Sequence, residues 1–251
     1  MSFGISQCKI PQNFRCEIFD SIDSTNDECM RRALSGDPGG LWIVASHQTA
    51  GRGRRSKVWD SNKGNLYSSL LLIDNISNNS ATLLPFATAV AIHSVITSIL
   101  PVEADIKIKW PNDLLISKRK VAGILIETIK LKNDLQSIII GIGINIEYCP
   151  KDVPYPVTFL NKEGVDLVLI DVLPILFQEM EKILIILKQD KGREEIMRLW
   201  RCFAYGIGDF ITINLPNRSI KGRFIGVDDF GYMLLEKKGS FFRFFTGEVF
   251  E

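Results

Sequence analysis

The chain has 251 residues, which is enough for one large domain and one small domain. Hydrophobic residues make up 46% of the chain and charged residues 24%, proportions typical of a globular protein and not of a disordered one. The net charge is +1, so no overall field draws the protein toward nucleic acid or a membrane, and any basic chemistry has to be local.

The first third of the chain predicts short strands around one helix. Thr25 and Glu28 have the spacing of a capping box, which predicts a helix from there to about Leu34. The glycine-rich segment 36–40 ends this helix. A long glycine- and arginine-rich loop without apolar periodicity covers residues 51–65. The strand candidates are the short run 15–19, the apolar and β-branched run 41–46 and the buried run 66–73.

An uncharged stretch runs from Asn75 to Val102 and is long enough to span a bilayer. Pro85 interrupts this stretch. The helix expected over residues 81–100 has one mildly polar face, which contains His93. This pattern predicts a packed helix of a soluble protein, so we expect no membrane partner.

The rest of the chain predicts strands, two helices and a small β-domain. Tight turns join the strand candidates 106–110, 114–117, 121–129 and 137–146. A proline-rich connection, 149–156, leads to helices over 169–187 and 194–203. The segment 207–250 has short β-runs with turns at 216–217, 228–229 and 238–239, which predict a small β-barrel.

This order of elements predicts an α+β fold, with a mixed sheet and helices packed on one face of it. We expect two domains: residues 1–205 form a catalytic domain and residues 206–251 a C-terminal barrel.

Four of the seven residues from Gly51 to Lys57 are cationic, and two are glycines. Such a loop suits a phosphate or a carboxylate, because glycines allow close backbone approach and guanidinium groups neutralise charge. A solvated basic loop and a nucleic-acid patch remain alternatives. Ser56 stands where a dinucleotide-binding fingerprint needs its third glycine, and the chain contains no P-loop. Trp59 could stack on a purine or be an ordinary packed side chain.

Three further segments are candidates for chemistry. The turn Lys109–Asp113 could present a carboxylate to magnesium or to a basic partner, or serve only the backbone. The cationic tip ending at Lys120 could aim one lysine into a cleft, or be a charged hairpin end. The glycines of 141–145 could admit a ligand or mark a bulge.

Some common catalytic signatures are missing from the sequence. The two histidines lack metal spacing, and the five cysteines contain no CxxC pair. There is no GxSxG elbow. Chemistry by positioning and charge neutralisation is therefore favoured over a protein nucleophile. With no secretory signal in residues 1–15, we expect free thiols in a cytoplasmic protein.

Taken together, these segments resemble the biotin–protein ligase family. The matching runs occur in the family's order and include a glycine–glutamate–valine run in the terminal barrel: residues 23–26, 48–55, 109–113, 119–127, 141–145 and 247–249. The resemblance implies a synthetase-like catalytic domain followed by an SH3-like barrel. It also implies a two-step reaction, in which the biotin carboxylate attacks ATP to give biotinyl-5'-AMP and a lysine of a carrier protein then accepts biotin.

The resemblance also implies roles for individual residues. The implied biotin-binding residues are Ser24, Thr25, Asn26, Gln48, Gly51, Arg52, Gly53, Arg54, Lys120 and Gly123. The implied ATP-binding residues are Arg54, Lys57, Trp59, Asn112, Lys120 and Asn145. The implied catalytic residues are Lys120, Arg54 and Asp113. No metal is expected to be fixed by the protein alone, and Mg²⁺ would arrive with ATP, near Asp113.

The expected partner is the biotin carboxyl carrier protein domain of acetyl-CoA carboxylase or a related carboxylase. A homodimer is also an open expectation. Only about 14 residues precede the first strand, so no helix-turn-helix and no nucleic-acid partner is expected. A lipoate–protein ligase is the closest rival, since it shares the fold and the adenylate chemistry. The 51–55 loop and the terminal barrel favour biotin.

Overall fold

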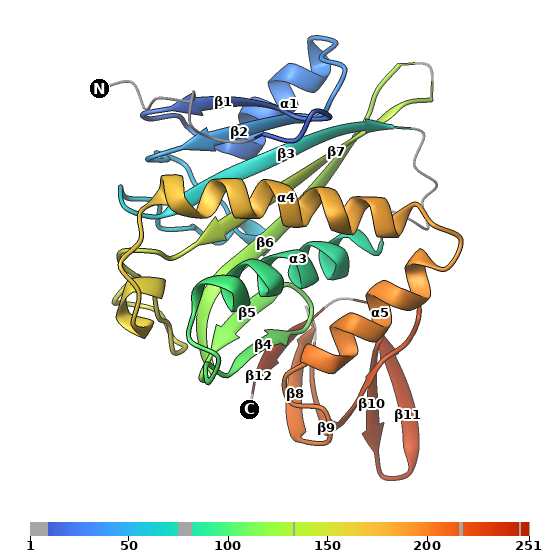
Figure 1. Ribbon diagram of the computed structural model, residues 1–251. Helices are drawn as coiled ribbons and strands as arrows, with labels where there is room; N and C mark the ends of the chain where they lie inside the picture. Colours follow the sequence, from blue (N-terminus) through green and yellow to red (C-terminus); the bar gives the residue numbers. More distant parts are fainter. Residues whose placement is uncertain (1–9, 75–81, 133, 216–217, 246, 251) are drawn as a thin grey trace.

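The computed structural model describes residues 10–74, 82–132, 134–215, 218–245 and 247–250. A seven-stranded sheet forms its centre, in the order β1-β2-β3-β7-β6-β5-β4 (Figure 1). Its strands are β1 (Arg15–Phe19), β2 (Leu41–Ala45), β3 (Leu66–Asp74), β4 (Ile106–Lys109), β5 (Asp113–Ile116), β6 (Arg119–Lys130) and β7 (Gln136–Ile144). Only β1 and β2 pair in parallel, so the sheet is mixed, as predicted.

Helices cover both faces of this sheet. The described helices are α1 (Thr25–Leu34), α3 (Leu84–Ile99), α4 (Leu169–Leu187) and α5 (Gly192–Phe203), with the described 3-10 turns η2 (Arg54–Ser56) and η3 (Leu160–Glu163). Helices α3 and α4 share one core with the sheet, and α4 reaches β2 through the ring contact of Phe177 with Trp42. Helix α1 packs on the opposite face, where Cys29 and Ala33 meet Ile43.

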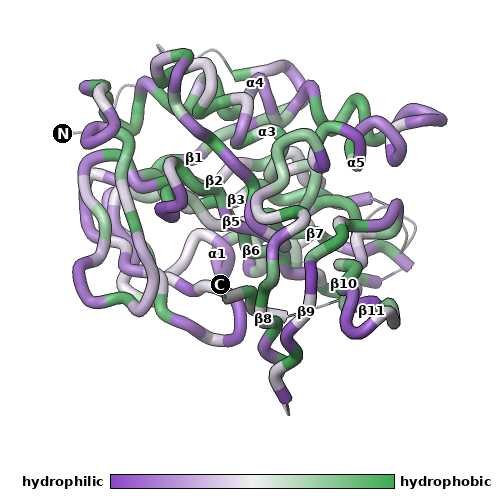
Figure 2. The backbone as a smooth tube through the Cα atoms, turned by 90° about the horizontal axis from the view of Figure 1, so that it is seen from below, coloured by the Kyte–Doolittle hydropathy of each residue, from purple (hydrophilic) through white to green (hydrophobic). Residues whose placement is uncertain are grey.

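The prediction that the helices pack on one face is therefore wrong for α1. The central strands are apolar on both sides, and β2 is buried along its whole length. Such a strand needs cover on each face, which its periodicity alone does not reveal. Figure 2 shows hydrophobic segments gathered toward the middle of the molecule, among the strands and α3.

The start of α1 differs from its prediction in a way that affects the site. Ser24, and not Thr25, is the N-cap: its hydroxyl accepts a hydrogen bond from the backbone N–H of Asp27. Thr25 is the first helical residue, and its hydroxyl is free to donate to Gln48 instead. Glu28 pairs with Arg31 and Arg32 and does not close a capping box.

The uncharged helix is α3, which begins at Leu84 and ends at Ile99. Residues 75–81 of the uncharged stretch lie outside the described residues. Among the helices that are described, none is long and apolar enough to cross a membrane. His93 is buried in α3 and stacks on Phe203 of α5, with ring centroids 3.8 Å apart.

The C-terminal strands form a second, antiparallel sheet in the order β11-β10-β9-β8-β12. They are β8 (Phe210–Leu215), β9 (Arg218–Val227), β10 (Met233–Lys237), β11 (Ser240–Phe244) and β12 (Glu248–Phe250). The turn expected at 216–217 lies outside the described residues. The indole N–H of Trp110 donates to the Gly231 carbonyl at 3.2 Å, so the turn before β5 is packed against this small sheet.

Candidate active site

The floor of the site is one row of residues across the large sheet. Tyr67, Gly143, Gly123, Asp113 and Lys109 lie directly opposite one another on β3, β7, β6, β5 and β4. Paired residues of neighbouring strands project on the same face. Two adjacent glycines therefore leave a trough between the Tyr67 ring on one side and the Asp113 carboxylate on the other.

The indole of Trp59 fills this trough. A Cβ atom added to Gly143 would lie 2.6 Å from the Trp59 Cε2 atom, and one added to Gly123 would lie 2.9 Å from Cζ3. Both glycines are paired in register on both sides, so neither marks a bulge. Their lack of a side chain serves the close approach of the indole. The Trp59 indole nitrogen is buried there without a hydrogen-bond partner.

The loop that carries Trp59 is a folded hairpin. Arg52 and Val58 form a bridge, Gly53 N–H donates to the Lys57 carbonyl at 2.7 Å, and Trp59 N–H donates to the Gly51 carbonyl at 3.0 Å. We call residues 51–59 the lid. The turn at its tip is the 3-10 segment η2. A single 3-10 turn is too short to show apolar periodicity, so the sequence predicted only an irregular loop here.

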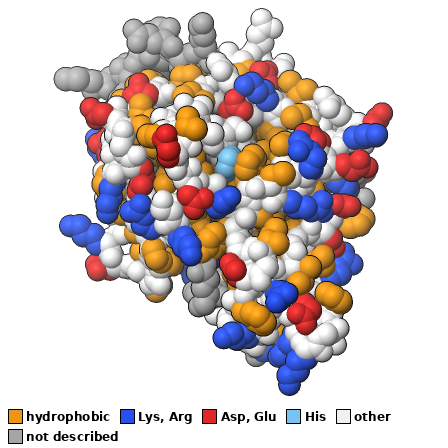
Figure 3. Space-filling model, turned by 60° about the horizontal axis from the view of Figure 1, so that its bottom comes forward, with side chains coloured by type: hydrophobic (Ala, Val, Ile, Leu, Met, Phe, Trp, Pro, Cys, Tyr) orange, Lys and Arg blue, Asp and Glu red, His pale blue; other side chains and the backbone are white. Residues whose placement is uncertain are grey.

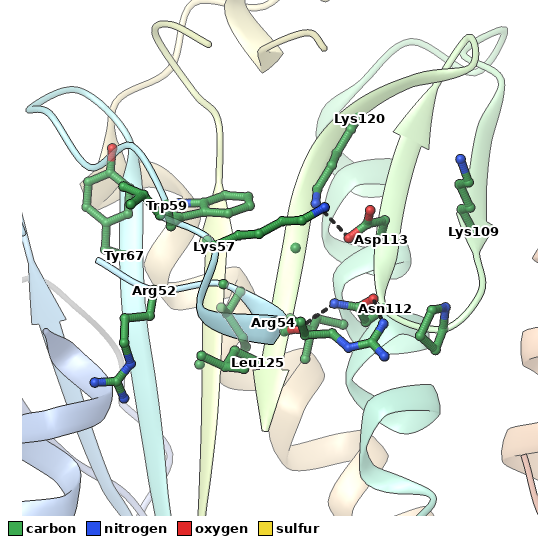
Figure 4. A pocket seen from close by; sticks show the side chains of 18 of the residues that line it. Arg52, Arg54, Lys57, Trp59, Tyr67, Lys109, Asn112, Asp113, Lys120 and Leu125 are labelled. Atoms are coloured by element: carbon green, nitrogen blue, oxygen red, sulfur yellow. Dashed lines mark hydrogen bonds and ion pairs between the residues drawn. The ribbon is translucent and has the colours of Figure 1, made fainter. Parts of the chain in front are cut away.

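Two cationic side chains meet polar groups of the Trp110–Asp113 turn (Figure 4). Arg54 of the lid donates to the Asn112 side-chain carbonyl at 3.0 Å. The Lys120 ammonium lies 2.8 Å from an Asp113 carboxylate oxygen. Lys120 also lies over two aromatic rings, with its nitrogen 5.2 Å from the Trp59 centroid and 5.5 Å from that of Tyr155. These contacts fix the lysine in one place, and its side chain is only 15% exposed.

The other end of the site is a chain of hydrogen bonds at the start of α1. Gln48 accepts from both the backbone N–H and the hydroxyl of Thr25, at 2.8 and 3.1 Å. The Ser69 hydroxyl lies 2.7 Å from the Thr25 hydroxyl and 2.6 Å from the Asn26 carbonyl oxygen. Gly141 faces Asn26 so closely that a side chain there would collide with the amide. The donors and acceptors of this end suit a polar, uncharged group such as an amide or a ureido ring.

These two ends open into one pocket, and most of the predicted site residues line it. Those that line it are Ser24, Thr25, Asn26, Gln48, Arg52, Gly53, Arg54, Lys57, Trp59, Asn112, Asp113, Lys120 and Gly123. Gly51 and Asn145 do not line the pocket. Gly51 is buried at the base of the lid, and the Asn145 amide donates to the Thr158 carbonyl at 3.0 Å.

Several lining residues were missed by the sequence analysis. They are Tyr67, Leu125 and Tyr155, the basic residues Lys109 and Lys118, and Gly247 and Val249 of the C-terminal segment. Tyr67 and Leu125 could have been found by writing out the sheet register from the glycines of β6 and β7. Tyr155 lies in a proline-rich segment with no pattern to place it.

The pocket is strongly cationic. Its described lining contains six Lys or Arg residues and a single carboxylate, that of Asp113. Such an excess favours an anionic ligand. The cavity volume is about 190 Å³, smaller than the roughly 300–1,000 Å³ of pockets that take drug-sized ligands. Lid residues line the cavity, and the Trp59 indole occupies the space above Gly123 and Gly143. The fold and the site thus define a class of protein whose pocket suits a small polar group beside an anionic one, beneath the lid.

Comparisons with known proteins give the family. Residues 18–145 match the Biotin/lipoate A/B protein ligase family, and residues 206–250 match the Biotin protein ligase C terminal domain. A biotin–[acetyl-CoA-carboxylase] ligase of Paracoccus denitrificans is 32% identical, over 85% of this chain and 90% of its own. The bifunctional ligase/repressor BirA of Bacillus subtilis is 33% identical, over 92% of this chain and 72% of its own.

A solved structure agrees with these matches. The biotin protein ligase from Aquifex aeolicus in complex with biotin and ATP has a TM-score of 0.76 and 27% identity, and the alignment covers 94% of this chain and 97% of that one. The chain belongs to the biotin protein ligase family.

Proposed function

We propose that this chain joins biotin to ATP and passes the activated biotin to a lysine of a biotin carboxyl carrier protein domain. The observation that carries the proposal is the pocket itself: a hydrogen-bonding end and a cationic end meet beneath an arginine-bearing lid. Two matched family segments and relatives named as biotin ligases support it. The match to a biotin protein ligase C-terminal domain favours biotin over lipoate.

In the first step, a biotin carboxylate oxygen attacks the α-phosphorus of ATP, a P–O bond forms, and pyrophosphate leaves. Both reactants are anions, so their approach requires cations on the protein. Arg54, Lys57 and Lys120 would neutralise the phosphate and carboxylate oxygens at the cationic end. Holding the two reactants side by side can supply about 7–11 kcal/mol of the barrier. No protein nucleophile is needed, since the substrate carboxylate is the nucleophile.

In the second step, the lysine amine of the carrier attacks the carbonyl carbon of the adenylate. An amide bond forms, AMP leaves with the electrons of the broken C–O bond, and the amine releases a proton. Water would compete with the amine, so the lid protects the intermediate. The polar end would hold the ureido ring of biotin through Thr25, Asn26 and Gln48.

Asp113 is the carboxylate closest to this chemistry. Its contact with Lys120 supports a role in positioning that lysine. Mg²⁺ is usually bound through one or two carboxylates together with substrate phosphates, and Asp113 could be one such ligand for the magnesium of ATP. Trp59 would pack against the adenylate near the Gly123–Gly143 trough. Asn145 would contact the nucleotide only if its amide left the Thr158 carbonyl.

The wider context is part of the same proposal. We place the domain boundary at 205/206 and the protein in the cytoplasm.

We also propose homodimerisation, for which the outer edge of β1 is available: β1 is a terminal strand of the sheet and pairs only with β2 among the described strands. No nucleic-acid partner is proposed, since cationic and anionic side chains are interspersed over the face seen in Figure 3. Sedimentation velocity tests the dimer.

The first half-reaction can be tested without a carrier. Purified protein with Mg-ATP should exchange labelled pyrophosphate into ATP only when biotin is present. A carrier domain should then become reactive to streptavidin. Exchange that depends on lipoate and not on biotin would reverse the assignment. If the protein binds oligonucleotides in a salt-sensitive way and does not bind biotin, the proposed ligase activity is refuted.

A further inference from the structure

Two carboxylates outside the pocket hold the first arginine of the lid. The Arg52 guanidinium contacts both Asp27 carboxylate oxygens, at 2.5 and 2.6 Å, and its second nitrogen contacts Glu127, at 2.9 and 3.2 Å. Neither carboxylate lines the pocket. We propose that Asp27 and Glu127 are positioning residues that hold the lid closed over the pocket. For its effect on catalysis, the inference rests on the proposed function.

The contacts join three separate elements. Asp27 lies in the first turn of α1, Glu127 lies on β6, and Arg52 lies at the base of the lid. All three side chains are between a quarter and about a third exposed, so solvent screens these pairs less than it screens a fully exposed pair. The Asp27 hydrogen bonds and the charge of Glu127 raise the Arg52 pKa above its usual value.

Holding Arg52 also holds the far side of the lid, because the lid is a hairpin. The Arg52 backbone is bridged to Val58, and the next hydrogen bond joins Gly51 to Trp59. A movement of Arg52 away from α1 and β6 would therefore shift the strand that carries Trp59. The indole in the Gly123–Gly143 trough is thus connected mechanically to Asp27 and Glu127.

A second connection runs through the polar end of the pocket. The Asn26 amide donates to Glu127 at 2.7 Å, and from Asn26 the hydrogen bonds continue through Ser69 and Thr25 to Gln48. The Gln48 amide then donates to the Ser61 hydroxyl at 2.9 Å.

Ser61 in turn donates to the Trp59 carbonyl at 2.8 Å. Both ends of the lid are therefore connected to one hydrogen-bond network. Glu127 takes part in both connections, directly through Arg52 and, by way of Asn26, through the path to Trp59. The Glu127 Oε2 atom accepts from Asn26 and from Arg52 at the same time, and the carboxylate charge pairs with the guanidinium.

Arg52 and Arg54 of the lid then have different tasks. Arg52 has its charge balanced by two carboxylates, so it serves closure. Arg54 donates to the Asn112 side-chain carbonyl and lines the cationic end of the pocket, so it faces the ligand's phosphate or carboxylate oxygens. This division predicts that loss of either carboxylate changes ligand retention and affinity without changing the rate of the chemical step.

The test uses the full-length chain with Asp27→Asn and Glu127→Gln, and with Glu28→Gln as the matched control. Glu28 is also acidic and in the first turn of α1, but it pairs with Arg31 and Arg32, away from the lid. Trypsin cleavage within residues 52–57 of the ligand-free protein reports lid opening. Pyrophosphate exchange gives KM for biotin and kcat, and a chase experiment gives the rate of adenylate release.

We expect each lid variant to speed cleavage, raise the biotin KM and speed adenylate release by about threefold, with kcat and the melting temperature unchanged. Glu28→Gln should behave as wild type in these readouts. Wild-type behaviour of both lid variants would overturn the proposal, as would an equal effect of Glu28→Gln, which would indicate fraying of α1. If the wild type shows no biotin-dependent exchange, the proposed function fails, while the cleavage rates still decide whether the carboxylates hold the lid.

Discussion

The Trp59 indole and Gly143 should be energetically coupled, because the indole occupies the space of the missing side chain. In Gly143→Ala the new Cβ would start 2.6 Å from Cε2 and 2.7 Å from Cζ2 and the indole nitrogen. Carbon atoms in contact need about 3.5 Å, so the indole has to move by about 1 Å. Overpacking of this kind costs about 1–3 kcal/mol. We therefore expect Gly143→Ala to lower the free energy of unfolding by that amount.

A double-mutant cycle measures the coupling directly. In the Trp59→Ala background the trough is empty, so Gly143→Ala should cost almost nothing. Gly123→Ala, whose nearest contact is 2.9 Å, should cost less than Gly143→Ala in the wild-type background. Urea unfolding followed by circular dichroism gives all the values needed. Additivity of the Gly143 and Trp59 changes within about 0.5 kcal/mol would refute the placement of the indole.

Three further outcomes are expected. Arg54→Gly should speed release of biotinyl-adenylate by about 10²-fold in a chase assay, because one preorganised cation is lost. Arg55→Gly, at a position that does not line the pocket, should change the release rate little. Equal release rates for both variants would contradict the role of Arg54 in holding the adenylate. Burial lowers the pKa of His93 to about 4 from 6.5, so the unfolded state binds the extra proton between these values. The free energy of unfolding should be insensitive to His93 above pH 6.5 and should fall by roughly 3 kcal/mol toward pH 4. Urea titrations give this free energy at each pH, and a His93→Leu variant with the same pH dependence as the wild type would exclude His93 as the cause. Ser56 has a φ of 58°, a left-handed conformation that costs about 1 kcal/mol outside glycine, so Ser56→Gly should slow tryptic cleavage of the ligand-free lid, and Ser56→Ala should not.

Much of the local structure follows from the sequence by itself. Apolar patterns in the sequence predict the strands over 15–19, 41–45 and 66–74 and the long helix over 169–187. The cationic run at 51–57 predicted a loop suited to an anionic ligand, since glycines and arginines without apolar periodicity have no core to join. The antiparallel turns after residue 105 also followed from local signals, because a turn is determined by the residues within it.

Tertiary structure decided what these pieces do together. The register of β6 against β7 places Gly123 and Gly143 side by side, and that pairing creates the trough for Trp59. It also brings Asp27 and Glu127, a hundred residues apart, onto one guanidinium group. Contacts of this kind depend on strand order and on which face α1 covers. The free energy that selects both comes from burying apolar surface throughout the core, and no local segment of the sequence contains that information.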